Sequence, residues 1–205
     1  AGLFPGNLVL DLSSAVIQQS LAERITRMNG VPETPTSPRV LGPMMCVPFG
    51  KLLRGRVVPN TVTKTLHTDR VFAPDLSASR IDAFPGYSDL QAQIRTLKSF
   101  ERPVILVDDL LHRPGRLNAV LPLLRQEGVQ IGAVMLGILS GLGADTMAPS
   151  GLPVSGIYNI PNLRYWFVDS TLYPFIGGDT VRRAHAPVSG LLPTINQILP
   201  YTHPG

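Results

Sequence analysis

The sequence has a single cysteine and little charge. Because Cys46 stands alone, a disulfide framework within the chain and a zinc site built on paired cysteines are both excluded. A reducing compartment is the simplest setting for such a chain, and we expect a cytoplasmic protein. Charged residues make up 16% of the chain, the net charge is +4, and the basic residues are scattered. Scattered charge does not favour nucleic acid as a partner, whereas a positive balance suits anionic ligands such as phosphates.

Long apolar runs and several well-known motifs are also absent. No run reaches the roughly 18 apolar residues that a membrane span needs, so we expect no membrane partner. The motifs GxGxxG, HExxH and GxSxG do not occur in the sequence. Gly50-Lys51 lacks the glycine spacing of a phosphate loop, and Leu52 stands where that motif has Ser or Thr.

The chain is rich instead in apolar residues and proline. Its hydrophobic content is 44%, and 20 of its 205 residues are proline, which is ample for a core and for many ordered loops. We expect an N-terminal helix and linker at residues 1–38, ending in the segment PETPTSP, and an α/β domain at residues 39–205. The sequence begins with Ala1 and not Met, so we expect a processed chain or a part of a larger polypeptide. A homo-oligomer stays open as well.

Helical and strand patterns alternate through the middle of the chain. Apolar spacing predicts helices within residues 8–29, 88–100 and 117–128, and continuous apolar runs predict strands at 104–107 and 130–139. Ser88 and Gln91 form a capping box for the second helix, whereas Pro122 conflicts with a regular third helix. Residues 44–58 favour a strand, a turn and a short helix. The order predicts an α/β fold with a mostly parallel sheet flanked by helices, a helical N-terminal appendage and a loop-rich C-terminus.

Two acids follow the apolar run at 104–107. In open α/β sheets ligands bind at the carboxyl ends of strands, which is where we expect Asp108 and Asp109. Adjacent carboxylates accept hydrogen bonds from the hydroxyls of a ribose or hold a divalent metal. The turn after them leads into a helix, whose free N–H groups favour phosphate, and Arg113 and Arg116 add cationic donors. The alternative is that Asp109 only caps the next helix and that Asp108 is solvated.

The segment VILVDDLLHRPGRL, residues 104–117, resembles the phosphoribosyl-pyrophosphate motif of type I phosphoribosyltransferases. That motif has four apolar residues, two acids, three variable residues and a loop of small residues. The resemblance implies that Asp108 and Asp109 hold the ribose 2′ and 3′ hydroxyls, often with Mg²⁺. It also implies that residues 113–117, with Arg113, Gly115, Arg116 and Leu117, cradle the 5′-phosphate.

The turn after the acids departs from the family pattern. His112 occupies a position that is often an acid or another catalytic residue in the family. Arg113, Pro114 and Arg116 replace small residues, and Gly115 alone remains of them. Guanidinium groups therefore replace the hydroxyl contacts that the family makes to phosphate.

The stretch PNTVTKTLHTDR, residues 59–70, is the second candidate region. It precedes a long excursion at residues 69–86, and excursions of that length are often lids. Lys64 and His67 are similar in kind to the basic residues that bind pyrophosphate near a mobile loop in the phosphoribosyltransferase family. The alternative is a solvated edge strand.

Two glycine-bearing loops complete the candidate set. Residues 141–145 and 177–179 each place glycine beside an acid, and either shapes an acceptor pocket or forms an ordinary turn. Arg182 and Arg183 either meet an anionic ligand or are solvated. Neither loop identifies the acceptor.

Three functions remain in competition. The first is a phosphoribosyltransferase-like protein that binds phosphoribosyl pyrophosphate or a related ribose phosphate with Mg²⁺ and transfers the phosphoribosyl group with release of pyrophosphate. In this reading Asp109, His112, Lys64 and His67 are the catalytic candidates. The second is a non-catalytic regulatory module that binds a sugar phosphate or nucleotide. The third is a metal-dependent enzyme that acts on nucleotide sugars, with Asp108 and Asp109 as the metal ligands.

Overall fold

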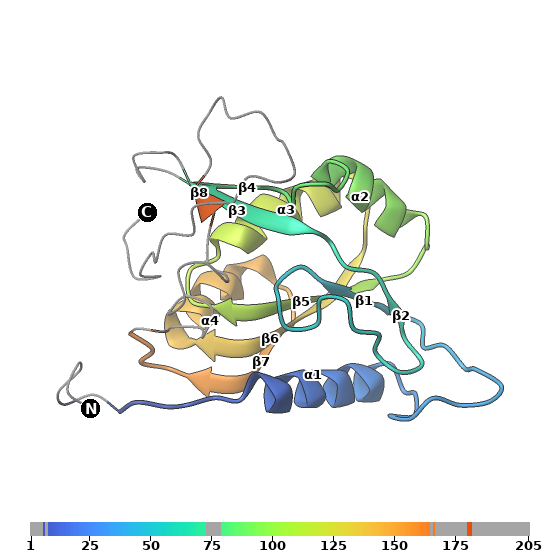
Figure 1. The fold of residues 1–205 in the computed structure, drawn as a ribbon, viewed down its shortest axis with the longest axis horizontal. Coiled ribbons are helices and arrows are strands. Elements are labelled where there is room, and N and C mark those ends of the chain that lie inside the picture. The colour runs from blue at the N-terminus through green and yellow to red at the C-terminus, as the bar shows by residue number, and fades with distance from the viewer. Residues whose placement is uncertain (1–5, 7, 73–78, 165, 167–179, 182–205) are drawn as a thin grey trace.

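The computed structural model describes residues 6, 8–72, 79–164, 166 and 180–181. In this part of the chain two sheets are present (Figure 1). The larger sheet is entirely parallel and has the order β2-β1-β5-β6-β7. Its strands are β1 (Met45–Pro48), β2 (Val62–Thr63), β5 (Val104–Leu111), β6 (Ile131–Ser140) and β7 (Val154–Ile160). The predicted α/β class with a mostly parallel sheet is therefore confirmed.

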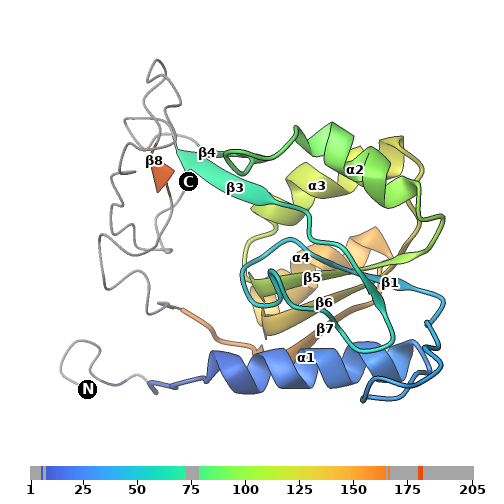
Figure 2. The ribbon, with the colours of Figure 1, turned by 45° about the vertical axis from the view of Figure 1, so that its right-hand side comes forward.

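The smaller sheet is built on a hairpin. In it β3 (Thr68–Phe72) pairs antiparallel with β4 (Ser79–Ala83) and parallel with β8 (Thr180–Val181). This hairpin begins one residue before the excursion predicted at residues 69–86 and otherwise lies within it. In the turned view of Figure 2 it extends from the side of the large sheet that carries α2 (Leu90–Lys98) and α3 (Gly115–Gln126).

Helices cover both faces of the large sheet. On one face lies α1 (Ser14–Met28), whose residues Ile17, Leu21 and Ile25 are buried in a cluster with side chains of β1, β5 and β6. On the other face α2 and α3 pack against the alternate residues of the same strands (Figure 1). Alternation along a strand sends successive side chains to opposite faces, which is why a strand covered on both sides is continuously apolar. The N-terminal helix thus forms one whole layer of the core.

The connections place a topological switch between β1 and β5. From β1 the chain passes to β2 at one edge, and it later returns through β5, β6 and β7 on the other side. Met45 pairs with Val104 and Pro48 with Val107, so the pairing ends where β1 ends, while β5 continues to Leu111. Loops that leave neighbouring strands in opposite directions open a crevice at such a point.

Several local predictions need correction. Asp89, and not Ser88, caps α2, because its carboxylate accepts from the Ala92 amide at 2.6 Å. The short helix predicted within residues 44–58 does not form, because the chain makes turns at residues 51–55. Residues 141–145, predicted as a loop, begin α4 (Gly141–Met147), which is followed by the short 3-10 helix η1 (Ala148–Ser150). Pro122 lies inside α3, which begins at Gly115 and continues past it to Gln126, although proline supplies no amide to the helix.

Two further predictions concern the second glycine loop, with the arginines after it, and membrane spans. Residues 177–179, Arg182 and Arg183 lie outside the described residues. Across the described ranges, none of the helices is long and apolar enough to cross a bilayer.

Candidate functional site

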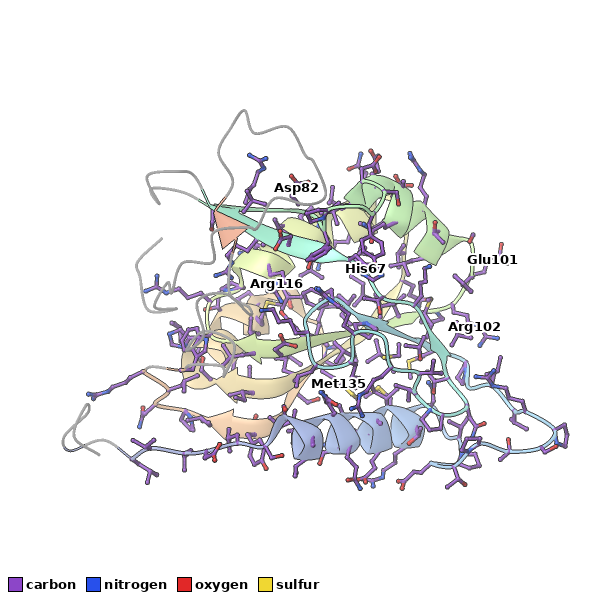
Figure 3. The ribbon with its side chains drawn as sticks, viewed as in Figure 1. His67, Asp82, Glu101, Arg102, Arg116 and Met135 are labelled. Carbon is purple, nitrogen blue, oxygen red and sulfur yellow. The ribbon has the colours of Figure 1, made fainter. Side chains whose placement is uncertain are left out.

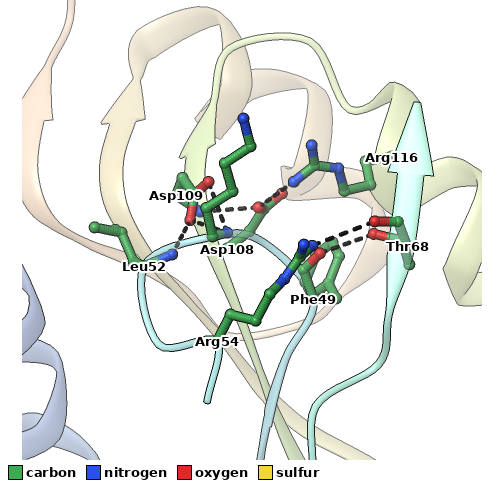
Figure 4. Close-up of polar contacts among 8 residues, drawn as sticks. Phe49, Leu52, Arg54, Thr68, Asp108, Asp109 and Arg116 are labelled. Carbon is green, nitrogen blue, oxygen red and sulfur yellow. Dashed lines mark hydrogen bonds and ion pairs between the residues drawn. The ribbon is translucent and has the colours of Figure 1, made fainter. Parts of the chain in front are cut away.

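The loop that follows β1 passes the two acids at the switch point, where Phe49 and Leu52 lie close to Asp108 and Asp109 (Figure 4). Gly50 directly follows Phe49, whose amide continues the pairing of β1 with β5 by donating to the Val107 carbonyl at 2.9 Å. A Cβ atom on Gly50 would lie 2.2 Å from Asp108 Oδ1 and 2.5 Å from Asp109 Oδ1. Real Cβ atoms do not approach so closely, so only glycine lets the backbone pass between both carboxylates. The site is thus built from both strands that flank the switch.

Asp109 holds the loop that follows β1. Its carboxylate accepts hydrogen bonds from the Lys51 amide at 2.7 and 2.8 Å and from the Leu52 amide at 2.7 Å. The alternative that Asp109 caps the next helix is wrong, because the N-cap of α3 is Pro114 and the Asp109 carboxylate accepts from the loop amides instead. Charge-assisted bonds of this kind are stronger than neutral ones and fix the loop against the central strand.

Asp108 is buried and paired with Arg116. It is 5% exposed, so the alternative of a solvated carboxylate is wrong. Arg116 Nη1 donates to its Oδ1 at 2.7 Å, and the Asp109 amide donates to the same oxygen at 2.8 Å. Burial outweighs the attraction of Arg116 and raises the pKa of Asp108 to about 6. This carboxyl group therefore titrates close to neutrality.

The turn after the acids is shorter than predicted, because β5 continues to Leu111 and α3 begins at Gly115. Gly115, Arg116 and Leu117 therefore form the first helical turn, and the first amides of a helix have no acceptor inside it. Leu117 is 1% exposed and its side chain belongs to the core, so it offers a ligand only its backbone. Arg113 is exposed.

His112 lies in the turn and contacts the next strand. Its Nδ1 is 3.0 Å from Ser140 Oγ at the end of β6, and its ring centroid is 5.1 Å from that of Trp166. Burial, and then the charge of Arg113, lower the pKa of His112. A neutral imidazole is favoured here at neutral pH.

Lys64 directly follows β2, and His67 directly precedes β3. His67 stacks on Tyr87 with ring centroids 3.6 Å apart, and Lys64 is exposed. Burial, followed by the charges of Arg54 and Lys64, lowers the pKa of His67. In the described structure, neither Lys64 nor His67 makes a hydrogen bond or ion pair with Asp108 or Asp109. Figure 3 nevertheless places His67 and Arg116 on the same side of the sheet, away from α1.

Arg54 connects the two regions. It lies on the loop that Asp109 holds, and its Nη2 donates to the Thr68 carbonyl at 3.3 Å (Figure 4). Thr68 Oγ1 in turn donates to the Phe49 carbonyl at 2.8 Å. The Arg54 guanidinium also lies 5.4 Å from the centre of the Phe84 ring. Arg54 therefore connects the base of the β3–β4 hairpin with the loop that follows β1.

A Mg²⁺ ion has a limited donor set at this site. Asp108 and Asp109 supply two adjacent carboxylates, which are the hard oxygen donors that Mg²⁺ prefers. Within the described residues, no group of three or more His, Cys, Asp or Glu side chains is placed to hold a metal. Both carboxylates already accept hydrogen bonds from protein groups, Asp108 from Arg116 and Asp109 from the Lys51 and Leu52 amides.

Comparisons with known proteins add no relative. No family model matches this sequence, and no curated protein matches it at a significant level.

Several residues of the site escape sequence reasoning. Gly50, the Lys51 and Leu52 amides and Arg54 all come from a loop that matches no phosphate-loop pattern. Ser140 reads as the start of a glycine-rich loop after the strand at 130–139, although a serine directly before a helix is a typical N-cap. Gly50, which comes just after a predicted strand, is the one signal in the sequence that the backbone approaches other groups closely there.

Proposed function

We propose that this protein binds phosphoribosyl pyrophosphate or a related ribose phosphate at the carboxyl end of β5. The observation that carries the proposal is the meeting of Gly50 with Asp108 and Asp109 at the switch between β1 and β5. Ligands of open α/β sheets bind in the crevice at that point. The resemblance of residues 104–117 to the phosphoribosyl-pyrophosphate motif falls on the same residues.

The polar groups around this point suit the parts of such a ligand. Asp108 and Asp109 would accept hydrogen bonds from the vicinal ribose hydroxyls, with Mg²⁺ shared between them and the ligand. The uncapped N-terminus of α3, with His112 and Arg113 beside it, would bind the 5′-phosphate. Lys64 and His67 would face the pyrophosphate.

We propose further that the protein transfers the phosphoribosyl group. In that reaction the bond between the ribose C1′ and the pyrophosphate oxygen breaks, the acceptor forms the new bond to C1′, and pyrophosphate leaves with the bonding electron pair. Positive charge develops on the ribose ring and negative charge on the leaving group. Lys64, and the polar edge of His67, would stabilise the departing charge, because fixed donors act where charge develops.

A non-catalytic binding module is the second candidate. Arg116 donates to Asp108, and Asp109 accepts from two loop amides, so both groups are committed to protein partners in this structure. Such commitments suit a pocket that holds a ligand without turning it over.

Calorimetric titration with phosphoribosyl pyrophosphate and Mg²⁺ tests the common core of both candidates. We expect binding by the wild type and its loss when Asp108→Asn and Asp109→Asn are combined. Glu101→Gln is the matched control, because Glu101 is exposed beyond the opposite end of β5 (Figure 3). Release of pyrophosphate with any of a panel of acceptors supports the transferase, and binding without release supports the module. Unchanged binding by the double variant would overturn both.

A further inference from the structure

The hydroxyl of Ser140 has two partners in a buried position. Ser140 ends β6 and directly precedes α4, and it is 1% exposed. Its Oγ accepts a hydrogen bond from the Gly143 amide at 3.0 Å and lies 3.0 Å from His112 Nδ1. The first contact caps α4, and the second joins β6 to the turn after β5.

The direction of the second hydrogen bond follows from the first. A serine hydroxyl carries one hydrogen and can accept at its oxygen. The Gly143 amide can only donate, so Ser140 Oγ is the acceptor in that bond. The hydroxyl hydrogen of Ser140 therefore still needs an acceptor of its own. A buried hydroxyl hydrogen without an acceptor is costly. In the described structure, Nδ1 of His112 is the acceptor within reach, so Ser140 donates and Nδ1 carries no proton.

A neutral imidazole whose Nδ1 accepts has its proton on Nε2. Among the described residues, none accepts a hydrogen bond from His112 Nε2, and His112 stands in the turn that leads into the uncapped N-terminus of α3. The ring is further confined by Trp166, which contacts it at an interplanar angle of 58°.

We propose that Ser140 is a positioning residue that holds His112 as the Nε2–H tautomer, so that His112 donates a hydrogen bond to a phosphate oxygen of the ligand. His112 then acts as a neutral donor and does not accept a proton as a general base. The assignment of the acceptor as a phosphate oxygen rests on the proposed function, whereas the tautomer of His112 does not.

Imidazole ¹⁵N shifts of His112 in uniformly labelled protein test the tautomer directly. We expect the wild type at neutral pH to show protonated Nε2 and unprotonated Nδ1. Ser140→Asp keeps an acceptor for the Gly143 amide but has no hydrogen to donate. It should therefore reverse the tautomer to Nδ1–H and raise the pH at which His112 titrates.

Two results would overturn the positioning role. One is Nδ1–H in the wild type, and this measurement decides even if Ser140→Asp does not fold. The other is a folded Ser140→Asp variant whose His112 shifts and titration match the wild type. Ser150→Ala is the control, because Ser150 donates to the Met147 carbonyl within η1 and its loss should leave His112 unchanged.

Titration with ribose 5-phosphate separates this inference from the proposed function. We expect the wild type to bind, with a shift of the His112 Nε2 signal, and Ser140→Ala to bind roughly tenfold more weakly, as expected for one hydrogen bond to a charged group. Ser140→Thr, which keeps the hydroxyl, should restore binding. If the wild type binds neither ribose 5-phosphate nor phosphoribosyl pyrophosphate, the proposed function fails while the tautomer is still decided by its shifts. If Ser140→Ala binds as tightly as the wild type, the donor role of His112 fails.

Discussion

Arg116 in the first turn of α3 donates to Asp108 in β5 over 2.7 Å and joins that helix to the central strand beside the site. Replacing Arg116 by Leu would leave the buried carboxylate without its ion-pair partner. We expect the free energy of unfolding to fall by about 3 kcal/mol well above pH 6, because an unpaired buried charge costs several kcal/mol. Urea denaturation of the variant measures this loss.

The double variant Asp108→Asn, Arg116→Leu serves as the control for that experiment. It removes the charge together with its partner and should recover most of the lost stability. Equal stability of wild type and Arg116→Leu at high pH would show that the pair contributes nothing.

The raised pKa of Asp108 predicts how stability depends on pH. The carboxyl group has a pKa of about 6 in the folded protein against 3.8 for the unperturbed group. Between these values the folded state binds the proton more tightly than the unfolded state. The favourable contribution is therefore complete below the lower value and is lost as the pH rises through the higher one, by roughly 3 kcal/mol in total. Unfolding of the wild type measured against Asp108→Asn over this range isolates the group, and a constant difference would contradict the assignment.

A methyl group at Gly50 should damage the site more than the fold. The new Cβ would push against Asp108 Oδ1 and Asp109 Oδ1, and the carboxylates would have to turn away. We expect Gly50→Ala to weaken binding of ribose phosphates by at least about tenfold and to cost about 1–3 kcal/mol of stability. Gly132→Ala is the matched control, because a Cβ there comes closest to the flexible Met44 side chain, at 3.1 Å, and meets the Val104 carbonyl at an ordinary 3.6 Å. Unaltered affinity in Gly50→Ala would place the ligand elsewhere.

Loss of the Asp109 carboxylate should release the loop that follows β1. In Asp109→Ala the Lys51 and Leu52 amides lose their acceptor, so both should exchange with solvent much faster. Stability should fall by about 1–3 kcal/mol, the usual cost of leaving hydrogen-bonding groups unsatisfied. Hydrogen exchange followed by NMR gives the readout. Amides of α1, on the far side of the sheet, provide the internal reference and should keep their relative protection.

Arg54 should stabilise the base of the β3–β4 hairpin. Arg54→Ala removes the hydrogen bond to the Thr68 carbonyl and the guanidinium beside Phe84, each worth about 0.5–1.5 kcal/mol. We expect faster amide exchange in β3 and β4 with little change in β5. Arg80→Ala offers a comparison within the hairpin, because Arg80 is exposed and its ion pair with Asp82, at 3.5 Å, stays within the hairpin. The same exchange rates in both variants would argue against a tie through Arg54.

The sequence predicts those parts of the fold that depend on local pattern. The apolar run at 104–107 marks the strand buried on both faces, and the spacing of Ile17, Leu21 and Ile25 marks α1, because burial demands these periods. The start of α2 was misplaced by one residue, since Ser88 and Asp89 are both good caps and only the chain path decides between them. The helix at 141–147 was missed because its glycines disfavour a helix and its cap depends on Ser140.

The site was predictable only on one side. Two acids after a buried apolar run can be read locally, but the structure places both inside β5, just beyond its pairing with β1. Their partners cannot be read, because the loop at 50–52 and Ser140 reach the acids and His112 only through the pairing of strands that are distant in sequence. Asp109 accepts from the loop amides and Arg116 donates to Asp108 because the fold brings these groups together. The motif itself does not predict either contact.

The hydrogen bonds from the Lys51 and Leu52 amides to Asp109 span 58 and 57 residues of chain. Such groups do not meet in the unfolded ensemble, so the arrangement comes into being together with the β1–β5 pairing. A compound that recognises it binds the native state alone and shifts the folding equilibrium by mass action. The rise in melting temperature of this chain therefore reports how tightly a compound binds. A collection of sugar phosphates can be ranked by this rise before any reaction is known.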